Sequence, residues 1–232
     1  MNQTTAVLNH AYRLRKRPIG EPQVSDLELV SEELAPLADG EALIRTLYLS
    51  LDPTYRLWMS DMRQYSPPVE LGAVMRGIGI GEVIESRRTD LPVGTLVSGY
   101  TDWQRYRVSG LDDDRPLNPL PDPLPAPLTT FLGALGHTGL TAYIGLELIG
   151  GVEPGQTLVV SAACGAVGSV VGQVAKARGA RVVGIAGGPE KCRHLVSQLG
   201  FDAAIDRHAP DWREQLASAT PDGIDIDFEN VG

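Results

Sequence analysis

Strand-like and helix-like segments alternate regularly through the second half of this 232-residue chain. Short β-branched runs such as TLVV (157–160) and RVVGIA (181–186) are each followed by a longer helix-like stretch, and the last strand-like run is IDIDFENV (224–231). Parallel strands need a crossover between them, so this alternation is typical of a parallel sheet covered by helices. The second half is therefore predicted to be a doubly wound α/β fold with four strands.

The first half of the chain is predicted to be β-rich. The segments EALIRTLYLSL (41–51), GIGIGEVIESR (77–87) and GTLVSGYTDWQRYRVS (94–109) are short, punctuated by glycine, and carry β-branched and aromatic residues. The proline-rich stretch LNPLPDPLPAPLTT (117–130) cannot continue a helix or a central strand, and we interpret it as a linker. These patterns predict a compact β domain over residues 1–125 and an α/β domain over residues 126–232.

Composition and charge exclude several classes of function. The net charge of −9 argues against nucleic acid as a partner, because phosphates attract basic faces. No apolar run approaches the ~20 residues that span a bilayer, and the N-terminus lacks a secretory signal, so we predict a cytoplasmic protein without a membrane partner.

The cysteines and histidines do not form a recognisable metal motif. Two cysteines are too few for a disulfide framework or a four-cysteine zinc site. The histidines show no mutual metal spacing, so we predict surface or core roles for them and no metal site. These residues are Cys164, Cys192, His10, His137, His194 and His208.

A glycine-containing turn, SAACGAVGS (161–169), joins the first strand of the α/β half to the helix that follows. Gly165 and Gly168 have the spacing of a dinucleotide fingerprint, with Ala163 in the place of the first glycine. Gly165 would let the backbone approach a pyrophosphate, Gly168 would let the helix pack closely, and the helix-start N–H groups would face the phosphates. Such glycines often serve packing alone, but their place in a βαβ series predicts dinucleotide binding.

The end of the second strand predicts which dinucleotide binds. A site for NAD usually ends this strand with an acid that accepts hydrogen bonds from the ribose 2′-hydroxyl. Here the sequence is AGGPEK (186–191), which offers the small residues Gly187 and Gly188 and then Lys191. Room and a cation favour a 2′-phosphate, so the predicted cofactor is NADPH. The alternative is that Lys191 is a solvated helix residue.

Several longer motifs occur in one order along the chain: LDPTYR (51–56), VMRGIGIGEVIESR (74–87), the glycine turn with its flanks, LGFDAAID (199–206) and PDGIDIDFENVG (221–232). With these motifs the chain resembles the zinc-independent 2-alkenal and prostaglandin reductases of the medium-chain dehydrogenase/reductase superfamily. The resemblance implies a GroES-like substrate domain, a Rossmann domain, and NADPH-dependent reduction of the carbon–carbon double bond of α,β-unsaturated aldehydes or ketones. It also implies a small enone or enal as partner and a homodimer for the full-length parent.

The resemblance also implies roles for individual residues. Gly165, Ala166, Val167 and Gly168 match the family's pyrophosphate turn, Lys191 matches its lysine for the 2′-phosphate, and Asn230 matches an asparagine that contacts the cofactor. Arg207 stands where the family usually has a tyrosine near the adenosine phosphate. An arginine there could bind phosphate bidentately, or it could be a surface residue.

The candidate catalytic residue is Tyr55. The family commonly carries a tyrosine directly after LDP, facing the substrate, whereas this chain has Thr54 there and Tyr55 one residue later. Either Tyr55 reaches the substrate carbonyl by a local shift, or it is a packed aromatic, which the shifted position favours slightly. Cys164, inside the glycine turn, is predicted to fill space, although its helix-start position could lower its pKa.

The number of strands leads to one more expectation. A complete sheet of the Rossmann type has about six strands, and only four precede the end of this chain. We therefore expect a fragment of a longer protein. Three hypotheses for its function stay open: an NADPH-dependent enone reductase, a quinone reductase of the neighbouring zinc-free branch, or a nucleotide-binding module without turnover.

Overall fold

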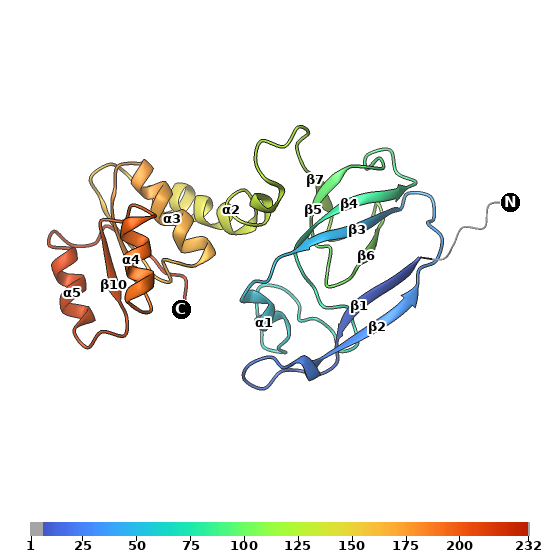
Figure 1. The fold of residues 1–232 in the computed structure, drawn as a ribbon, viewed down its shortest axis with the longest axis horizontal. Helices are drawn as coiled ribbons and strands as arrows, with labels where there is room; N and C mark the ends of the chain where they lie inside the picture. Colours follow the sequence, from blue (N-terminus) through green and yellow to red (C-terminus); the bar gives the residue numbers. More distant parts are fainter. Residues whose placement is uncertain (1–6, 232) are drawn as a thin grey trace. The chain divides into compact units, whose positions relative to one another are not determined.

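The computed structural model describes residues 7–231, and the chain divides into two compact units between Leu132 and Gly133. Figure 1 shows the elements of both units. The sequence placed this boundary at 125/126, a few residues earlier. No helix within the described residues is long and apolar enough to cross a membrane.

The first unit is built on a five-stranded antiparallel sheet with the order β6-β3-β4-β5-β7. Its strands are β3 (Ala42–Leu49), β4 (Gly79–Ser86), β5 (Leu96–Gly99), β6 (Tyr106–Ser109) and β7 (Leu117–Pro119). A separate antiparallel pair consists of β1 (Leu8–Leu14) and β2 (Leu27–Glu33). Three short helical segments complete the unit: η1 (Val24–Asp26), α1 (Thr54–Trp58) and η2 (Leu128–Leu132).

The glycines of the GIGIG run allow close contact between β4 and its neighbours. A Cβ atom on Gly81 would collide with the side chain of Ile44 in β3, and one on Gly79 would collide with the hydroxyl of Thr101. The sheet core behind them is formed by alternating buried side chains, namely Ala42, Ile44, Val83, Leu91, Val97 and Leu117. The run is therefore required by packing within this unit.

Two details of the first unit differ from the sequence prediction. The stretch 94–109 forms two strands, β5 and β6, because the backbone turns between them at Gly99 (φ 144°) and at Asp102 (φ 58°). The predicted linker also begins too early, since β7 pairs with β5 through the partners Val97 and Pro119. A proline is tolerated there because β7 is an edge strand, where one side needs no N–H donor.

The second unit contains a four-stranded parallel sheet with the order β10-β9-β8-β11. Its strands are β8 (Thr157–Val160), β9 (Arg181–Ala186), β10 (Ala203–Asp206) and β11 (Ile226–Phe228). Its helices are α2 (His137–Ile144), the π-helical segment η3 (Gly145–Gly150), α3 (Ala166–Ala177), α4 (Pro189–Ser197) and α5 (Trp212–Ala219). The predicted four strands and the helices between them are confirmed.

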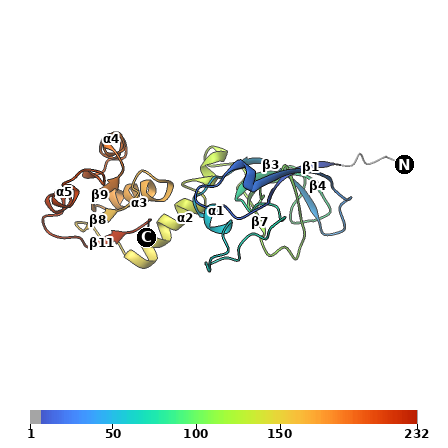
Figure 2. The same cartoon turned by 90° about the horizontal axis from the view of Figure 1, so that it is seen from below.

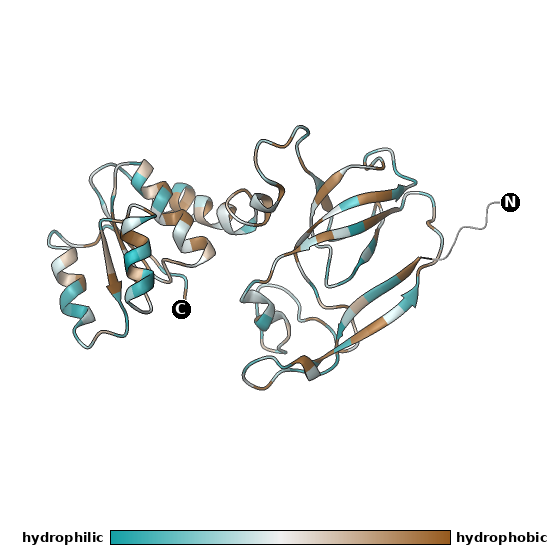
Figure 3. Cartoon of the chain, in the orientation of Figure 1, coloured by the Kyte–Doolittle hydropathy of each residue, from teal (hydrophilic) through white to brown (hydrophobic). Residues whose placement is uncertain are grey.

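Helices cover both faces of this parallel sheet, as Figure 2 shows for α3, α4 and α5. On one face, strand residues such as Leu158 and Val182 share a core with Val171 of α3 and Leu195 of α4. On the other face, the alternate strand residues pack against α5; these are Val159, Val183 and Ile205, with Trp212 and Leu216 of the helix. Figure 3 shows the largely hydrophilic α4 beside the hydrophobic β10. The doubly wound fold is therefore confirmed.

The order of the strands defines where a ligand would bind in this unit. The chain runs outward from β8 to β9 to β10 and then returns, through α5, to place β11 on the other side of β8. Open α/β sheets bind ligands beyond the carboxyl ends of the strands at such a reversal. The residues that follow β8, β9, β10 and β11 meet at this edge.

Candidate cofactor site and the Tyr55 cavity

A cavity of about 740 Å³ lies at the carboxyl edge of the parallel sheet. Residues that follow all four strands line it, as the fold requires. They include Gly165, Gly187, Lys191, Arg207, His208, Trp212 and Glu229. We call it the glycine-turn cavity.

The turn between β8 and α3 begins the cavity. Gly165 is the N-cap residue of α3, and its N–H donates to the carbonyl of Ala162 at 2.7 Å. Within the described residues, no hydrogen bond involves the backbone N–H groups of Ala166, Val167 or Gly168. Three unpaired donors at the positive end of a helix dipole suit a phosphate.

Gly168 fixes the distance between α3 and the turn. A Cβ atom there would lie 2.6 Å from the carbonyl oxygen of Ala162 and 2.9 Å from Cα of Ala163, both backbone atoms. The predicted packing role of Gly168 follows from this contact. Of the four predicted pyrophosphate residues only Gly165 lines the cavity, and Val167 packs partly against the core.

Basic side chains converge at the end of β9. Gly187 has no side chain, and a Cβ atom on it would lie 3.2 Å from Nε of Arg207 and 3.4 Å from Nε2 of His208. Lys191, in the first turn of α4, lines the same cavity. The structure therefore brings together the two predicted cations, Lys191 and Arg207, and adds His208.

The acidic residue at the end of β10 is engaged with the backbone. One carboxylate oxygen of Asp206 accepts the N–H of Gly188 at 2.8 Å and the N–H of His208 at 3.0 Å. The bond from Gly188 is the first cause that lowers the pKa of Asp206 below its ordinary value. Asp206 thus holds the two loops that present Lys191 and His208.

Asn230 joins the carboxyl ends of β8 and β11. Its backbone N–H donates to Oγ of Ser161 at 2.7 Å, and its side-chain Nδ2 donates to the carbonyl of Ser161 at 3.0 Å. Ser161 in turn donates to Glu229 at 2.8 Å. Glu229 lines the cavity and Asn230 does not, so a cofactor contact by Asn230 stays a prediction.

The two thiols are less acidic than an ordinary cysteine. Cys164 donates to the carbonyl of Lys191 at 3.4 Å, and burial raises the pKa of the Cys164 thiol. Burial also raises the pKa of Cys192. The expectation that the pKa of Cys164 is lowered is wrong, because desolvation by burial outweighs the charge of Lys191.

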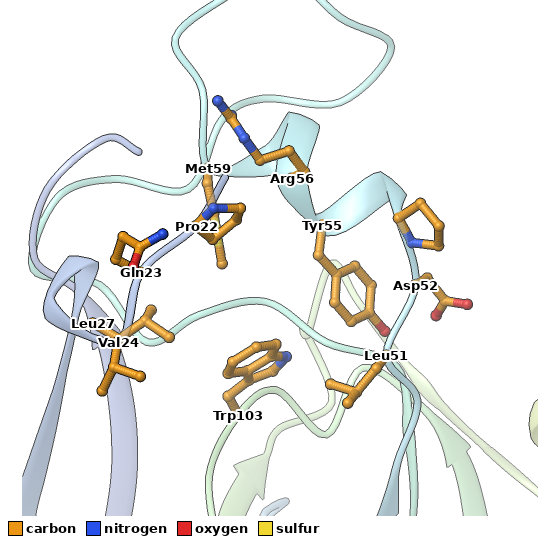
Figure 4. Close-up of a pocket in the computed structure, with 11 residues that line it drawn as sticks. Pro22, Gln23, Val24, Leu27, Leu51, Asp52, Tyr55, Arg56, Met59 and Trp103 are labelled. Carbon is orange, nitrogen blue, oxygen red and sulfur yellow. The ribbon is translucent and has the colours of Figure 1, made fainter. Parts of the chain in front are cut away.

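Tyr55 lies in a different cavity, within the first unit. This cavity has a volume of about 470 Å³. Figure 4 shows that its lining is mainly apolar and includes Leu51, Met59 and Trp103. Tyr55 itself is only 3% exposed, and its ring stacks on Trp58 with centroids 4.8 Å apart. We call this the Tyr55 cavity.

The hydroxyl of Tyr55 is already used within the protein. It accepts the backbone N–H of Ile78 at 2.8 Å. Burial is the main reason that its pKa lies well above the ordinary value. The neighbouring Thr54, in the place of the family's tyrosine, pairs instead with the hydroxyl of Tyr65 at 2.6 Å. These contacts are those of a packed aromatic, and the catalytic role of Tyr55 stays a prediction.

Sequence reasoning missed two residues of the glycine-turn cavity, His208 and Trp212. His208 was assigned a surface or core role because it has no metal spacing. Its position directly after Arg207, beyond the end of β10, was the signal that it belongs to the ligand edge. Among residues 7–231, no three His, Cys, Asp or Glu side chains are grouped so as to hold a metal ion.

Comparison with known families matches both halves of the chain. The family described as N-terminal domain of oxidoreductase matches residues 10–117, and the family described as zinc-binding dehydrogenase matches residues 166–232. The NADPH-dependent curcumin reductase of Escherichia coli is 48% identical over 229 residues, which cover 97% of this chain and 64% of that protein.

Two further relatives agree with these matches. Prostaglandin reductase 1 of Bos taurus is 42% identical over 224 residues, covering 96% of this chain and 65% of that protein. A crystal structure is known of CurA from Vibrio vulnificus in complex with NADPH. Its sequence is 44% identical to this chain, and the two structures superpose with a TM-score of 0.88 over 96% of this chain and 65% of that chain. The chain belongs to the medium-chain dehydrogenase/reductase superfamily. It falls in the curcumin and prostaglandin reductase branch, so the predicted family is confirmed.

The superfamily membership gives the two units their names. The antiparallel β unit is the GroES-like domain and the parallel unit is the Rossmann-like domain, as the resemblance implied. The chain spans about 64% of the length of the curcumin reductase that it matches.

Proposed function

We propose that the protein is an NADPH-dependent reductase of the carbon–carbon double bond of α,β-unsaturated aldehydes and ketones. The observation that carries this proposal is the convergence of Lys191 and Arg207 on a cavity that also contains the glycine turn. Relatives named for NADPH-dependent reduction support it.

The residues present fit the cofactor. Gly165 and the unpaired amides of Ala166 and Val167 would hold the pyrophosphate, because anions bind at helix N-termini. Lys191 and Arg207 would hold the 2′-phosphate, and where an NAD site carries an acid, Gly187 has no side chain and lets Arg207 and His208 lie against it. Within the described residues, no ion pair uses either cation, so both charges are available to a phosphate.

Reduced nicotinamide, when bound, supplies a hydride, which an enone accepts at its β-carbon. Negative charge then develops on the substrate carbonyl oxygen, and a hydrogen-bond donor there would stabilise it. Tyr55 is the candidate donor from the sequence. To serve, its O–H would have to point toward substrate while its oxygen keeps the bond from Ile78.

The test is titration of the purified chain with NADPH and with NADH, followed by addition of a simple enone while reduced-nicotinamide absorbance is recorded. Tryptophan emission reports binding, because Trp212 lines the cavity. We expect Lys191→Ala to weaken NADPH binding by about tenfold or more and to leave NADH unchanged, because a charge-assisted bond contributes about 1.5–3 kcal/mol.

Each outcome of this titration separates the hypotheses. Oxidation of NADPH on addition of enone supports the reductase, whereas oxidation only with a quinone favours the quinone-reductase alternative. Binding without oxidation of either kind favours a nucleotide-binding module. Equal affinity for NADPH and NADH would contradict the cofactor assignment.

A further inference from the structure

His208 lies beside the two cations assigned to the 2′-phosphate. It follows Arg207 beyond the carboxyl end of β10, and its imidazole lines the glycine-turn cavity. Its Nε2 atom and Nε of Arg207 both approach the same point above Gly187, the position where a Cβ atom would lie 3.4 Å and 3.2 Å from them. The side chains of two consecutive residues thus lie against the place that a side chain on Gly187 would occupy.

The backbone around His208 holds this arrangement. Asp206 accepts the N–H of His208 at 3.0 Å and the N–H of Gly188 at 2.8 Å with one oxygen. This single carboxylate therefore ties the loop after β10 to the loop after β9. The loop that carries His208 is fixed relative to Gly187 and Lys191 even though the side chain itself is exposed.

The imidazole has no other function in the described part of the chain. No hydrogen bond or ion pair between residues 7 and 231 uses the ring nitrogens of His208, and the ring is not part of a hydrophobic core. A ring nitrogen without a protein partner, next to an arginine and a lysine, is suited to an anion.

We propose that His208 is a specificity-determining residue that binds the 2′-phosphate of NADPH together with Lys191 and Arg207. This inference rests on the proposed function, because it assumes that the glycine-turn cavity takes the cofactor. A ligand without the 2′-phosphate gains nothing from His208. The residue should therefore affect the preference for NADPH over NADH and leave the affinity for NADH alone.

The experiment measures dissociation constants of NADPH and NADH for the full 232-residue chain by tryptophan emission. The variants are His208→Gln, which removes the imidazole and keeps a polar side chain, and His208→Lys, which places an ammonium group there. The matched control is His194→Gln, since His194 is an exposed histidine on α4 that does not line the cavity.

We expect His208→Gln to weaken NADPH binding about three- to tenfold and to leave NADH binding unchanged. His208→Lys should retain the NADPH preference, and His194→Gln should behave as the unmodified chain. An unchanged NADPH affinity in His208→Gln, or an equal loss for both cofactors, would overturn the inference.

The experiment distinguishes failure of the proposed function from failure of the inference on His208. If the unmodified chain binds neither cofactor, or binds both equally, the cofactor assignment itself is wrong and the role of His208 falls with it. If the unmodified chain prefers NADPH and His208→Gln prefers it equally, only the inference on His208 fails.

Discussion

The Tyr55 cavity and the glycine-turn cavity differ in what their polar atoms bind. Around Tyr55 the hydroxyl accepts a backbone N–H, and Nε1 of Trp58 donates to Tyr65 at 3.1 Å. The exception is Nε1 of Trp103, which is buried without a partner in the described structure. Three basic residues line the glycine-turn cavity, and their side chains have no protein partner among residues 7–231; the three amides that follow Gly165 at the start of α3 have none either.

This difference separates residues that stabilise a fold from residues that can bind a ligand. A buried polar group must be hydrogen-bonded, so the Tyr55 contacts contribute to folding whether or not a substrate binds. Exposed donors gathered around a cavity contribute little to folding and remain available.

Gly168→Ala should give the largest loss of stability. The added methyl group would overlap the backbone at Ala162 and Ala163, which cannot move as a side chain can. Overpacking of this kind costs about 1–3 kcal/mol, so we expect the free energy of unfolding in urea, followed by circular dichroism, to fall by that amount. NADPH binding should weaken as well, because α3 would be displaced from the turn.

The control for this substitution is Ser169→Ala, one residue further along α3, which should be nearly neutral. An unhindered glycine-to-alanine change inside a helix stabilises by about 0.5–1 kcal/mol. A gain of that size in Gly168→Ala would show that the helix does not depend on close packing at this residue.

Tyr55→Phe should destabilise the first unit by about 1–2 kcal/mol, because the N–H of Ile78 loses its acceptor in a buried place. The measurement is again urea unfolding, with an NADPH titration that we expect to be unchanged. Tyr48→Phe is the matched control, since Tyr48 is 46% exposed and its hydroxyl makes no hydrogen bond within the described residues. Full stability combined with a loss of enone turnover would instead establish Tyr55 as the catalytic donor.

Asp206→Asn should change how stability depends on pH. The pKa of Asp206 is lowered, so its carboxylate stabilises the folded state above the ordinary pKa of aspartate, and this contribution is lost as the pH falls through the folded value. We expect the unmodified chain to lose more stability between pH 5 and pH 3 than the variant does, as measured by urea midpoints.

The control is Asp222→Asn, an exposed aspartate of the same unit whose side chain makes no hydrogen bond or ion pair in the described structure. This variant should keep the acid sensitivity of the unmodified chain. If Asp206→Asn lost as much stability between pH 5 and pH 3 as the unmodified chain, the stability of the two loops would not depend on the charge of Asp206.

Much of the Rossmann-like unit could be predicted because its signals are local. Each strand is a short apolar run, and each helix is an amphipathic stretch. Gly165 and Gly168 mark the turn between strand β8 and helix α3. The GroES-like unit was predicted less completely. Its antiparallel pairs join distant segments, so β1, β2 and β7 left little trace in the local pattern.

The sequence predicts the order of the elements, the edge of the sheet where a ligand would bind, and the position of Lys191 and Arg207 at that edge. The first two properties and the position of Lys191 follow from hydrophobic periodicity and from residues next to strand ends, whereas Arg207 is identified through the family resemblance. The folded structure adds that the ring of His208 lies against Gly187 together with Arg207, and that the hydroxyl of Tyr55 is bound to Ile78. Both contacts depend on which loops the folded backbone brings within a few ångströms. The position of His208 after β10 indicates the ligand edge of the sheet, but a local pattern does not contain the contacts of its ring.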